Sequence, residues 1–329
     1  MIARKSTLPT LAVGLAVLLL VGASAYWLTS HSNGQSTARR IPVDGDRAYG
    51  YLKEICQIGP RPSGSPGMLQ QQRWLTEHFA TLGGRVSMQE FSVRHPETGD
   101  PVAIKNMLVE WHPERRERIL LCAHYDTRPF PDRDRTNPRG VFVGANDGGS
   151  GVALLAELAH HMGELNSRYG VDFVLFDGEE LVFDEGRDKD YYFLGSTHFA
   201  QEYARGTSDV RYRAGVLFDM VGDADLQLYY EVFSLRNARD VTLGIWKTAQ
   251  RLGVDEFKPR SRHEIRDDHL PLNNIAKIPT CDLIDFDYPR PGLRAPSYWH
   301  TEQDTVDKCS GESLAKVGWV VLEWLKSLK

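Results

Sequence analysis

The sequence has few cysteines, and none of them stands at a zinc-binding spacing. Its 329 residues include only Cys56, Cys122, Cys281 and Cys309, and no two of these form a Cys-x-x-Cys pair. We therefore expect no zinc site made of cysteine thiolates. In an exported protein the four side chains could form one or two disulfides, and the alternative is that they are buried free thiols.

The chain also lacks an excess of positive charge. Its formal net charge is -5 at pH 7, and Lys and Arg are interleaved with Asp and Glu instead of gathering in a stripe. Proteins that bind nucleic acid need a basic surface, so we expect no nucleic-acid partner. The sequence contains no internal repeats, and its hydrophobic content of 41% is enough for one sizeable core.

Only one long hydrophobic run occurs, close to residue 1. Residues 8–28 are uncharged and mostly apolar, and Arg4 and Lys5 precede them. A run of about 20 apolar residues can span a bilayer, and the flanking positive charges predict that the rest of the chain is exported. We expect residues 1–29 to be a membrane anchor, or a signal peptide cleaved near residues 23–25. The predicted location is then membrane-anchored outside the cytoplasm or, after cleavage, secreted or periplasmic.

The following residues are predicted to form a linker and one α/β domain. Residues 30–43 are small and polar, as in a flexible linker, and residues 44–329 are expected to form the catalytic domain. Apolar runs such as 118–123 and 171–176 suit buried strands, and they alternate with helical patterns. This order predicts a three-layer α/β/α sandwich with a central mixed, mostly parallel sheet. Ligands of such sheets bind beyond the carboxyl ends of the strands.

Side chains that can bind metal stand in six of the loops expected at this edge. They are His124 and Asp126, Asp147, Glu179 and Glu180, Asp219, Asp267 with Asp268 and His269, and His300. Each has an ordinary explanation when taken alone; Asp147, for example, could cap the helix that follows it. Six such loops at one edge are hard to explain in that way. Mixed His, Asp and Glu ligands without Cys suit a catalytic zinc ion with an open coordination position.

The adjacent pair Glu179-Glu180 carries the most information. Neighbouring side chains in extended or loop backbone point in different directions, so one carboxylate can bind metal while the other faces the reacting group. A carboxylate beside a dication is well suited to moving protons as a general acid or base.

Several motifs together resemble those of a known enzyme superfamily. GPRPSGSPG, CAHYDTR, GANDGGSGVALLAELA, FDGEE and a late His are similar to zinc-dependent aminopeptidases of the bacterial leucyl aminopeptidase type. The carboxyl-terminal third looks more like the animal-type glutaminyl-peptide cyclotransferases, which carry a DDH-I/L-P segment and a later Trp-His-Thr. These stand here at residues 267–271 and 299–301, and the resemblance extends from about residue 48 onward.

The resemblance implies how the metal and the proton are handled. It implies one zinc ion held by Asp147, Glu180 and His300, with Glu179 as the acid and base that moves the proton. The implied substrate is the free amino terminus of a peptide or protein. Its amino-terminal glutamine would be converted to pyroglutamate with release of ammonia, by zinc acting as a Lewis acid on the γ-carbonyl.

The resemblance also implies supporting roles around this centre. Asp219 and Asp267 would form a hydrogen-bond network with Glu179, and Trp299 would line the substrate pocket. His124 would be a relic of a second metal site. The resemblance implies nothing about oligomeric state.

Two other functions remain open at this point. A two-zinc aminopeptidase would use His124, Asp147, Glu180, Asp219 and His300 as ligands, with Glu179 deprotonating a water that attacks the first peptide bond. A non-catalytic peptide-binding ectodomain would be expected to have lost a ligand or the acid–base residue, and none is lost. The tandem Asp267-Asp268 and the Trp before His300 favour the cyclase.

Three features depart from the cyclase pattern. Residues 181–196 carry Phe and Tyr where the cyclases usually place a Trp, and residues 289–296 form an additional Pro- and Arg-rich stretch. The cyclase disulfide pattern also fails, because Cys122 is displaced by one residue and no Cys occurs in the helix after Asp147.

Overall fold

The computed structural model describes residues 2, 41–183, 191–288 and 297–328. Ile41–Lys329 form one compact unit. The predicted anchor or signal peptide, apart from Ile2, and residues 30–40 of the predicted linker lie outside the described residues. No helix in the described ranges combines the length and the apolar character that crossing a bilayer requires. Membrane attachment therefore stays a prediction.

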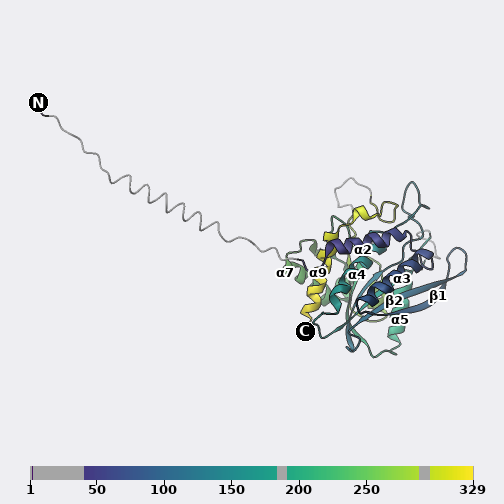
Figure 1. The fold of residues 1–329 in the computed structure, drawn as a ribbon, viewed down its shortest axis with the longest axis horizontal. Helices are drawn as coiled ribbons and strands as arrows, with labels where there is room; N and C mark the ends of the chain where they lie inside the picture. Colours follow the sequence, from purple (N-terminus) through teal and green to yellow (C-terminus); the bar gives the residue numbers. More distant parts are fainter. Residues whose placement is uncertain (1, 3–40, 184–190, 289–296, 329) are drawn as a thin grey trace. The chain divides into compact units, whose positions relative to one another are not determined.

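The centre of this unit is a mixed six-stranded sheet with the order β1-β2-β4-β3-β7-β10 (Figure 1). Its strands are β1 (Arg85–Arg94), β2 (Pro101–Trp111), β3 (Glu117–His124), β4 (Gly170–Phe176), β7 (Arg211–Asp219) and β10 (Thr280–Ile284). β3 runs parallel to both β4 and β7, and β7 runs parallel to β10. β2 is antiparallel to both of its neighbours, β1 and β4. The predicted mixed, mostly parallel sheet is thus confirmed.

Helices cover both faces of the sheet and complete the three predicted layers. One face packs against α2 (Gly45–Ile58), α3 (Pro66–Thr81), α4 (Gly151–Met162), α7 (Arg239–Leu252) and α9 (Gly311–Ser327). The other packs against α5 (Leu194–Ala204) and α8 (His269–Asn274). Within β3, Ile119 and Leu121 join the first of these two cores, while Leu120 and Cys122 join the second. Burial on both faces explains why the central strands are continuous apolar runs.

Short polar motifs fix the helices that surround the site. The Asp44 carboxylate caps α2 by accepting the backbone N–H of Arg47 at 3.0 Å. Glu157 of α4 holds the same end of α2, because it accepts from the Arg47 guanidinium at 2.6 Å and from the backbone N–H of Asp44 at 2.9 Å. These bonds tie the first helix to the helix that follows Asp147.

The structure contains short elements that the sequence patterns did not predict. They are β5 (Glu180–Leu181) and β6 (Tyr191–Tyr192), β8 (Leu228–Tyr230) and β9 (Phe257–Ser261), α6 (Val232–Asn237), and α8. The prediction of a loop at residues 267–269 was wrong at its end, since α8 begins at His269. Such elements are too short to show a hydrophobic period.

The cysteines and the surface charge bear on two further expectations. All four cysteines are free thiols, and three of them are buried, so the free-thiol alternative holds in this structure.

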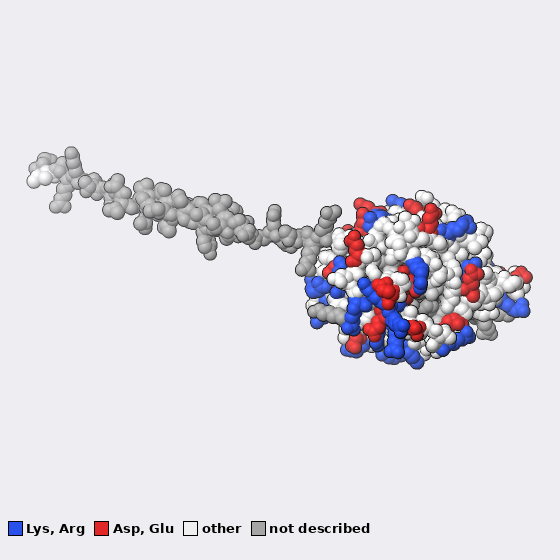
Figure 2. Space-filling view, turned by 60° about the horizontal axis from the view of Figure 1, so that its bottom comes forward, with Lys and Arg blue, Asp and Glu red and all other residues white. Residues whose placement is uncertain are grey.

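Acidic and basic side chains are interspersed on the face displayed in Figure 2. The expectation of no nucleic-acid partner stays a prediction.

Candidate active site

The candidate residues converge at the carboxyl ends of the parallel strands, as expected. His124 is the last residue of β3 and Asp219 is the last residue of β7. Glu179 and Glu180 follow β4 after a turn at Gly178, whose φ is +75°. Parallel strands end at a common edge, so these side chains come from three neighbouring strands to one place.

Asp147 reaches the same place from a turn before α4. Its backbone is not helical (φ -88°, ψ 108°), and the next residue, Gly148, has φ +80°. A Cβ on Gly148 would lie 2.5 Å from the carbonyl oxygen of Asp126, so only glycine fits there. The Asp304 carboxylate accepts the backbone N–H groups of Asn146 and Asp147 at 2.8 and 3.1 Å. A residue far along the chain, Asp304, thus fixes the backbone of the turn that carries Asp147.

The alternative that Asp147 caps α4 is wrong. The residue at the cap position of this helix is Ser150, and no side chain makes a capping hydrogen bond there. The Asp147 carboxylate instead faces two imidazoles, with Oδ1 3.3 Å from His124 Nε2 and Oδ2 3.3 Å from His300 Nε2. Burial disfavours its charged form, but the two imidazoles outweigh burial and lower the pKa of Asp147.

Asp126 sets the directions of the two glutamates. Its carboxylate oxygens accept the backbone N–H groups of Glu179 and Glu180 at 3.1 and 3.0 Å. The two side chains then diverge: Glu180 Oε1 lies 3.0 Å from His300 Nε2, and Glu179 Oε2 lies 3.9 Å from His124 Nδ1. This geometry agrees with the division of roles that the adjacent pair predicts.

Three side chains form the first candidate metal centre. Ligand atoms of Asp147, Glu180 and His300 lie within 4.8 Å of one another, and all three residues are buried. Asp147 Oδ2 and Glu180 Oε2 have no hydrogen-bond partner. His300 takes a left-handed backbone conformation, with φ +55°, which a non-glycine residue keeps only where its surroundings impose it. Unsatisfied buried oxygens beside an imidazole fit a zinc ion, which binds such mixed ligands.

Asp147 also belongs to a second candidate centre. Ligand atoms of His124, Asp147 and Asp219 again lie within 4.8 Å of one another, and His124 Nε2 is 3.2 Å from Asp219 Oδ1. One carboxylate is therefore shared between two ligand sets. His124 thus belongs to a complete candidate ligand set, and its implied role as a relic stays a prediction.

Arg128 is a member of the site that sequence reasoning missed. Its guanidinium donates to Glu180 Oε1 and to Asp132 Oδ2, both at 3.1 Å, and its side chain is only 3% exposed. Asp132 Oδ1 in turn lies 3.8 Å from His300 Nδ1. Arg128 thus orients Glu180 directly, and the Asp132 carboxylate that it also holds lies near His300. Its signal in the sequence was its place at the end of the CAHYDTR motif, to which no role was given.

A cavity of about 490 Å³ opens onto the first centre. Glu179, Asp219 and Asp267 line it together with the candidate ligands, and its apolar wall is formed by Met220, Ile265, Ile284, Phe286 and Trp299, among others. Trp299 packs against Phe286, with ring centroids 4.9 Å apart. The Arg133 guanidinium lies over the Trp299 ring, 3.9 Å from the ring centroid. The predicted position of Trp299 at the pocket therefore agrees with the structure.

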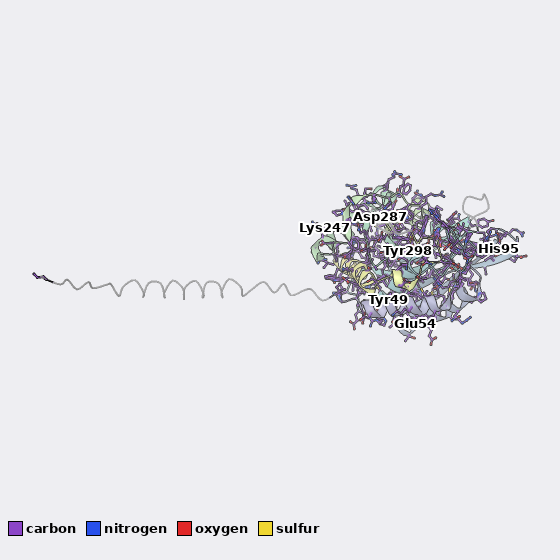
Figure 3. All side chains as sticks on the ribbon, turned by 90° about the horizontal axis from the view of Figure 1, so that it is seen from above. Tyr49, Glu54, His95, Lys247, Asp287 and Tyr298 are labelled. Carbon is purple, nitrogen blue, oxygen red and sulfur yellow. The ribbon has the colours of Figure 1, made fainter. Side chains whose placement is uncertain are left out.

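Contacts of Tyr298 hold the segment that carries His300 in place. Tyr298, labelled in Figure 3, stacks on Tyr288 with centroids 4.2 Å apart and donates a hydrogen bond to Asp223. Of the departures from the cyclase pattern, residues 289–296 and residues 184–190 lie outside the described residues. The aromatic residues of the 181–196 segment are described, and Tyr192 and Phe193 line the cavity.

The carboxylates in the cavity are electrostatically unusual. Burial, together with repulsion from the adjacent Glu180, raises the pKa of Glu179 well above its usual value, against the opposing effect of His124. Burial and the charge of Asp219 raise the pKa of Asp267 to about 7. Within the described part of the chain no hydrogen bond joins Glu179 to Asp219 or Asp267. The hydrogen-bond network that the resemblance implies is therefore not formed by direct bonds among these three side chains.

Comparison with known proteins places this site in a family. The family model described as "Peptidase family M28" matches residues 106–325. The crystal structure of Fimbriiglobus ruber glutaminyl cyclase is similar, with 41% identity and a TM-score of 0.83 over 88% of this chain and 97% of that chain. A leucine aminopeptidase precursor from Bacteroides thetaiotaomicron has 30% identity and a TM-score of 0.78 over 88% of this chain and 99% of its own.

A mammalian enzyme is also related. The glutaminyl-peptide cyclotransferase of Bos taurus is 26% identical over 257 residues, which are 68% of this chain and 67% of the bovine protein. The expected kinship with both zinc aminopeptidases and glutaminyl cyclases is confirmed by these matches. The chain belongs to peptidase family M28, and its structural neighbours include bacterial glutaminyl cyclases and zinc-dependent exopeptidases.

Proposed function

We propose that this protein is a glutaminyl-peptide cyclotransferase, which converts the amino-terminal glutamine of peptides or proteins to pyroglutamate and ammonia. The observation that carries the proposal is that one cavity brings together the Asp147–Glu180–His300 set, the separate carboxylate of Glu179 and the aromatic wall of Trp299. The 41% identity to a bacterial glutaminyl cyclase over nearly its whole length supports it.

The metal centre has a defined part in this proposal. Asp147, Glu180 and His300 would hold a zinc ion, and zinc supplies Lewis-acid activation of the γ-carbonyl of the substrate glutamine when it is bound there. Arg128 and Asp132 would keep two of these ligands in position. The aminopeptidases of the family share this ligand chemistry, so the metal alone does not distinguish the two activities.

The protein's own residues would then bind the substrate and move the proton. Glu179, Asp219 and Asp267 line the cavity, and their carboxyl oxygens can accept hydrogen bonds from the α-amino group of the substrate. Glu179, whose pKa is raised, takes a proton from the α-amine. The amine nitrogen forms a bond to the γ-carbonyl carbon, the bond from that carbon to the amide nitrogen breaks, and Glu179 returns the proton so that ammonia leaves.

Holding both reacting groups within one residue lowers the barrier further. The attack is intramolecular, so the enzyme needs mainly to orient the glutamine side chain and to exclude water. The apolar wall around Trp299 and Phe286 would do both. An open water-filled site would instead favour hydrolysis of the neighbouring peptide bond.

The assay uses the purified protein with two peptides that differ only in their first residue, Gln or Leu. The proposal predicts ammonia release from the Gln peptide and no free amino acid from either. Free leucine or free glutamine would contradict it. Glu179→Gln protein is the matched control, because it should release neither product while keeping its metal.

A two-zinc aminopeptidase is the second candidate, and the shared position of Asp147 favours it. His124, Asp147 and Asp219 form a second complete ligand set, as two adjacent zinc ions would need. The two candidate functions differ in the number of zinc ions that Asp147 helps to bind. The difference in zinc content between the wild type and Asp147→Ala should be one ion per chain for the cyclase and two for the aminopeptidase.

A further inference from the structure

A second group of buried ionisable side chains lies beside the active-site cavity. Asp267 lines that cavity, His269 is the first residue of α8, and Asp282 lies in β10. Their exposed fractions are 3%, 0% and 0%. One ligand atom from each of the three lies within 4.8 Å of the others. None of them belongs to the two ligand sets that share Asp147.

The polar atoms of this group are almost entirely unsatisfied. Both ring nitrogens of His269, both carboxylate oxygens of Asp282 and Oδ2 of Asp267 are buried without a hydrogen-bond partner. His269 Nδ1 lies 3.6 Å from Asp282 Oδ2, close enough to attract but without a hydrogen bond. Buried polar atoms normally have partners, so unsatisfied atoms of three side chains that lie this close together indicate a missing ligand. The Asp147–Glu180–His300 set shows the same signature.

Glu231 holds the imidazole from its other side. His269 Nε2 lies 3.3 Å from Glu231 Oε2. The Glu231 carboxylate is itself fixed, because it accepts the backbone N–H groups of Phe233 at 2.9 Å and Ser234 at 2.6 Å. Metal-binding histidines commonly have a carboxylate beside the ring nitrogen that does not bind the metal, and Glu231 stands beside His269 Nε2 in this way.

The excess of buried carboxylates around His269 also favours a bound cation. Asp267, Asp282 and Glu231 place three carboxylates around one imidazole, and Asp268 adds another buried carboxylate beside them. Burial and the nearby charges of Asp267 and Glu231 raise the pKa of Asp282 well above its usual value. A cation among these oxygens would relieve both effects.

We propose that Asp267, His269 and Asp282 form a further binding site for a divalent cation of the zinc or manganese type. One imidazole and two carboxylates suit these ions better than calcium or magnesium, which prefer oxygen ligands alone. Asp267 opens onto the cavity and so gives the ion a route into the interior. This site would exist whichever reaction the neighbouring centre performs. It would fix the position of Asp267 at the cavity wall.

The test removes the two ligand sets that share Asp147 with one substitution and counts the zinc that remains. Asp147→Ala deletes the residue that both sets share, and it leaves Asp267, His269 and Asp282 intact. The variant is saturated with Zn²⁺, dialysed, and measured for zinc per chain by mass spectrometry. The proposal predicts that about one zinc ion per chain is retained, and that Asp147→Ala/Asp282→Asn protein loses it.

The matched control is Asp147→Ala/Asp285→Asn. Asp285 is a buried aspartate just beyond the same strand, and it accepts backbone N–H groups outside the cluster. This control should keep the zinc. The proposal is overturned if Asp147→Ala protein binds no zinc, or if the Asp282→Asn double variant keeps as much as the control. If a variant does not fold, wild-type crystals decide: anomalous scattering at the zinc edge should show a peak between His269 and Asp282, and its absence also overturns the proposal.

Discussion

At the scale of single residues, the site is organised around Asp147 and the two glutamates. Asp147 is 3.3 Å from an imidazole on each side, while Glu180 and Glu179 diverge toward different histidines. The residue types and their places after strands could be predicted from the sequence. The contacts of Arg128 and Asp304 could not, because they depend on how the loops approach one another in space.

The divergence of the glutamates predicts different results for their substitutions. Glu179→Gln should lower kcat by about 10²–10⁴-fold and keep zinc, because a general acid–base residue is lost while the ligands remain. Glu180→Ala and His300→Ala should lose the zinc bound with Asp147. Zinc content and kcat of the three variants check this. Loss of zinc in Glu179→Gln protein would show that the two glutamates have exchanged roles.

At the scale of the elements, the ends of the parallel strands and the turn at Gly148 determine where the candidate metal ligands lie. The strands and longer helices of the described residues could be predicted from their apolar periods, and the convergence of His124, Glu179 and Asp219 followed from the parallel sheet. Short elements such as α8 and β8 could not be predicted, since six or fewer residues show no period. The start of α8 at His269 matters, because it turns that side chain toward Asp282.

The turn before α4 predicts a strong effect of a small substitution. Gly148→Ala should lower zinc affinity and activity, because φ +80° strains an alanine by about 1–3 kcal/mol and its Cβ would clash with the Asp126 carbonyl. Gly163→Ala is the control: its φ is -60° and a Cβ there meets no atom within 4 Å. Zinc titration of both variants provides the measurement. Equal zinc affinity in both would contradict the role of this turn.

The contact between α2 and α4 predicts a stability effect that depends on pH. Burial raises the pKa of Glu157, but contacts with His161 and Arg47 outweigh burial and hold it below the usual value. A lowered folded-state pKa stabilises the protein above the unfolded pKa of about 4.3, and this stabilisation is lost as pH falls through the folded value. Glu157→Gln should therefore destabilise the fold at pH 7 by about 1 kcal/mol, a modest value because the Arg47 side chain is 38% exposed.

Urea unfolding in the presence of a chelator tests this prediction without interference from metal release. The difference between Glu157→Gln and the wild type should shrink as pH falls below about 4.3. Glu164→Gln, at an exposed position just beyond α4, should match the wild type throughout. A difference that stays constant down to acid pH would show that Glu157 acts through packing and not through its charge.

At the scale of the whole molecule, the fold brings a candidate metal centre, the separate carboxylate of Glu179 and an apolar wall to one cavity. The three-layer fold and the family could be predicted from patterns and motifs, and the comparisons agree with both. The sequence left the choice between cyclisation and hydrolysis open, because both activities use the same ligand types. Both ligand sets around Asp147 are assembled in the structure, so the two activities are distinguished by their products.

The most direct test of the account is the mass spectrum of one peptide with amino-terminal glutamine after incubation with the wild-type protein. We expect a product of unchanged length that has lost the mass of ammonia, and an unaltered peptide with Glu179→Gln protein. A peptide shortened by its first residue would contradict the account and establish an aminopeptidase.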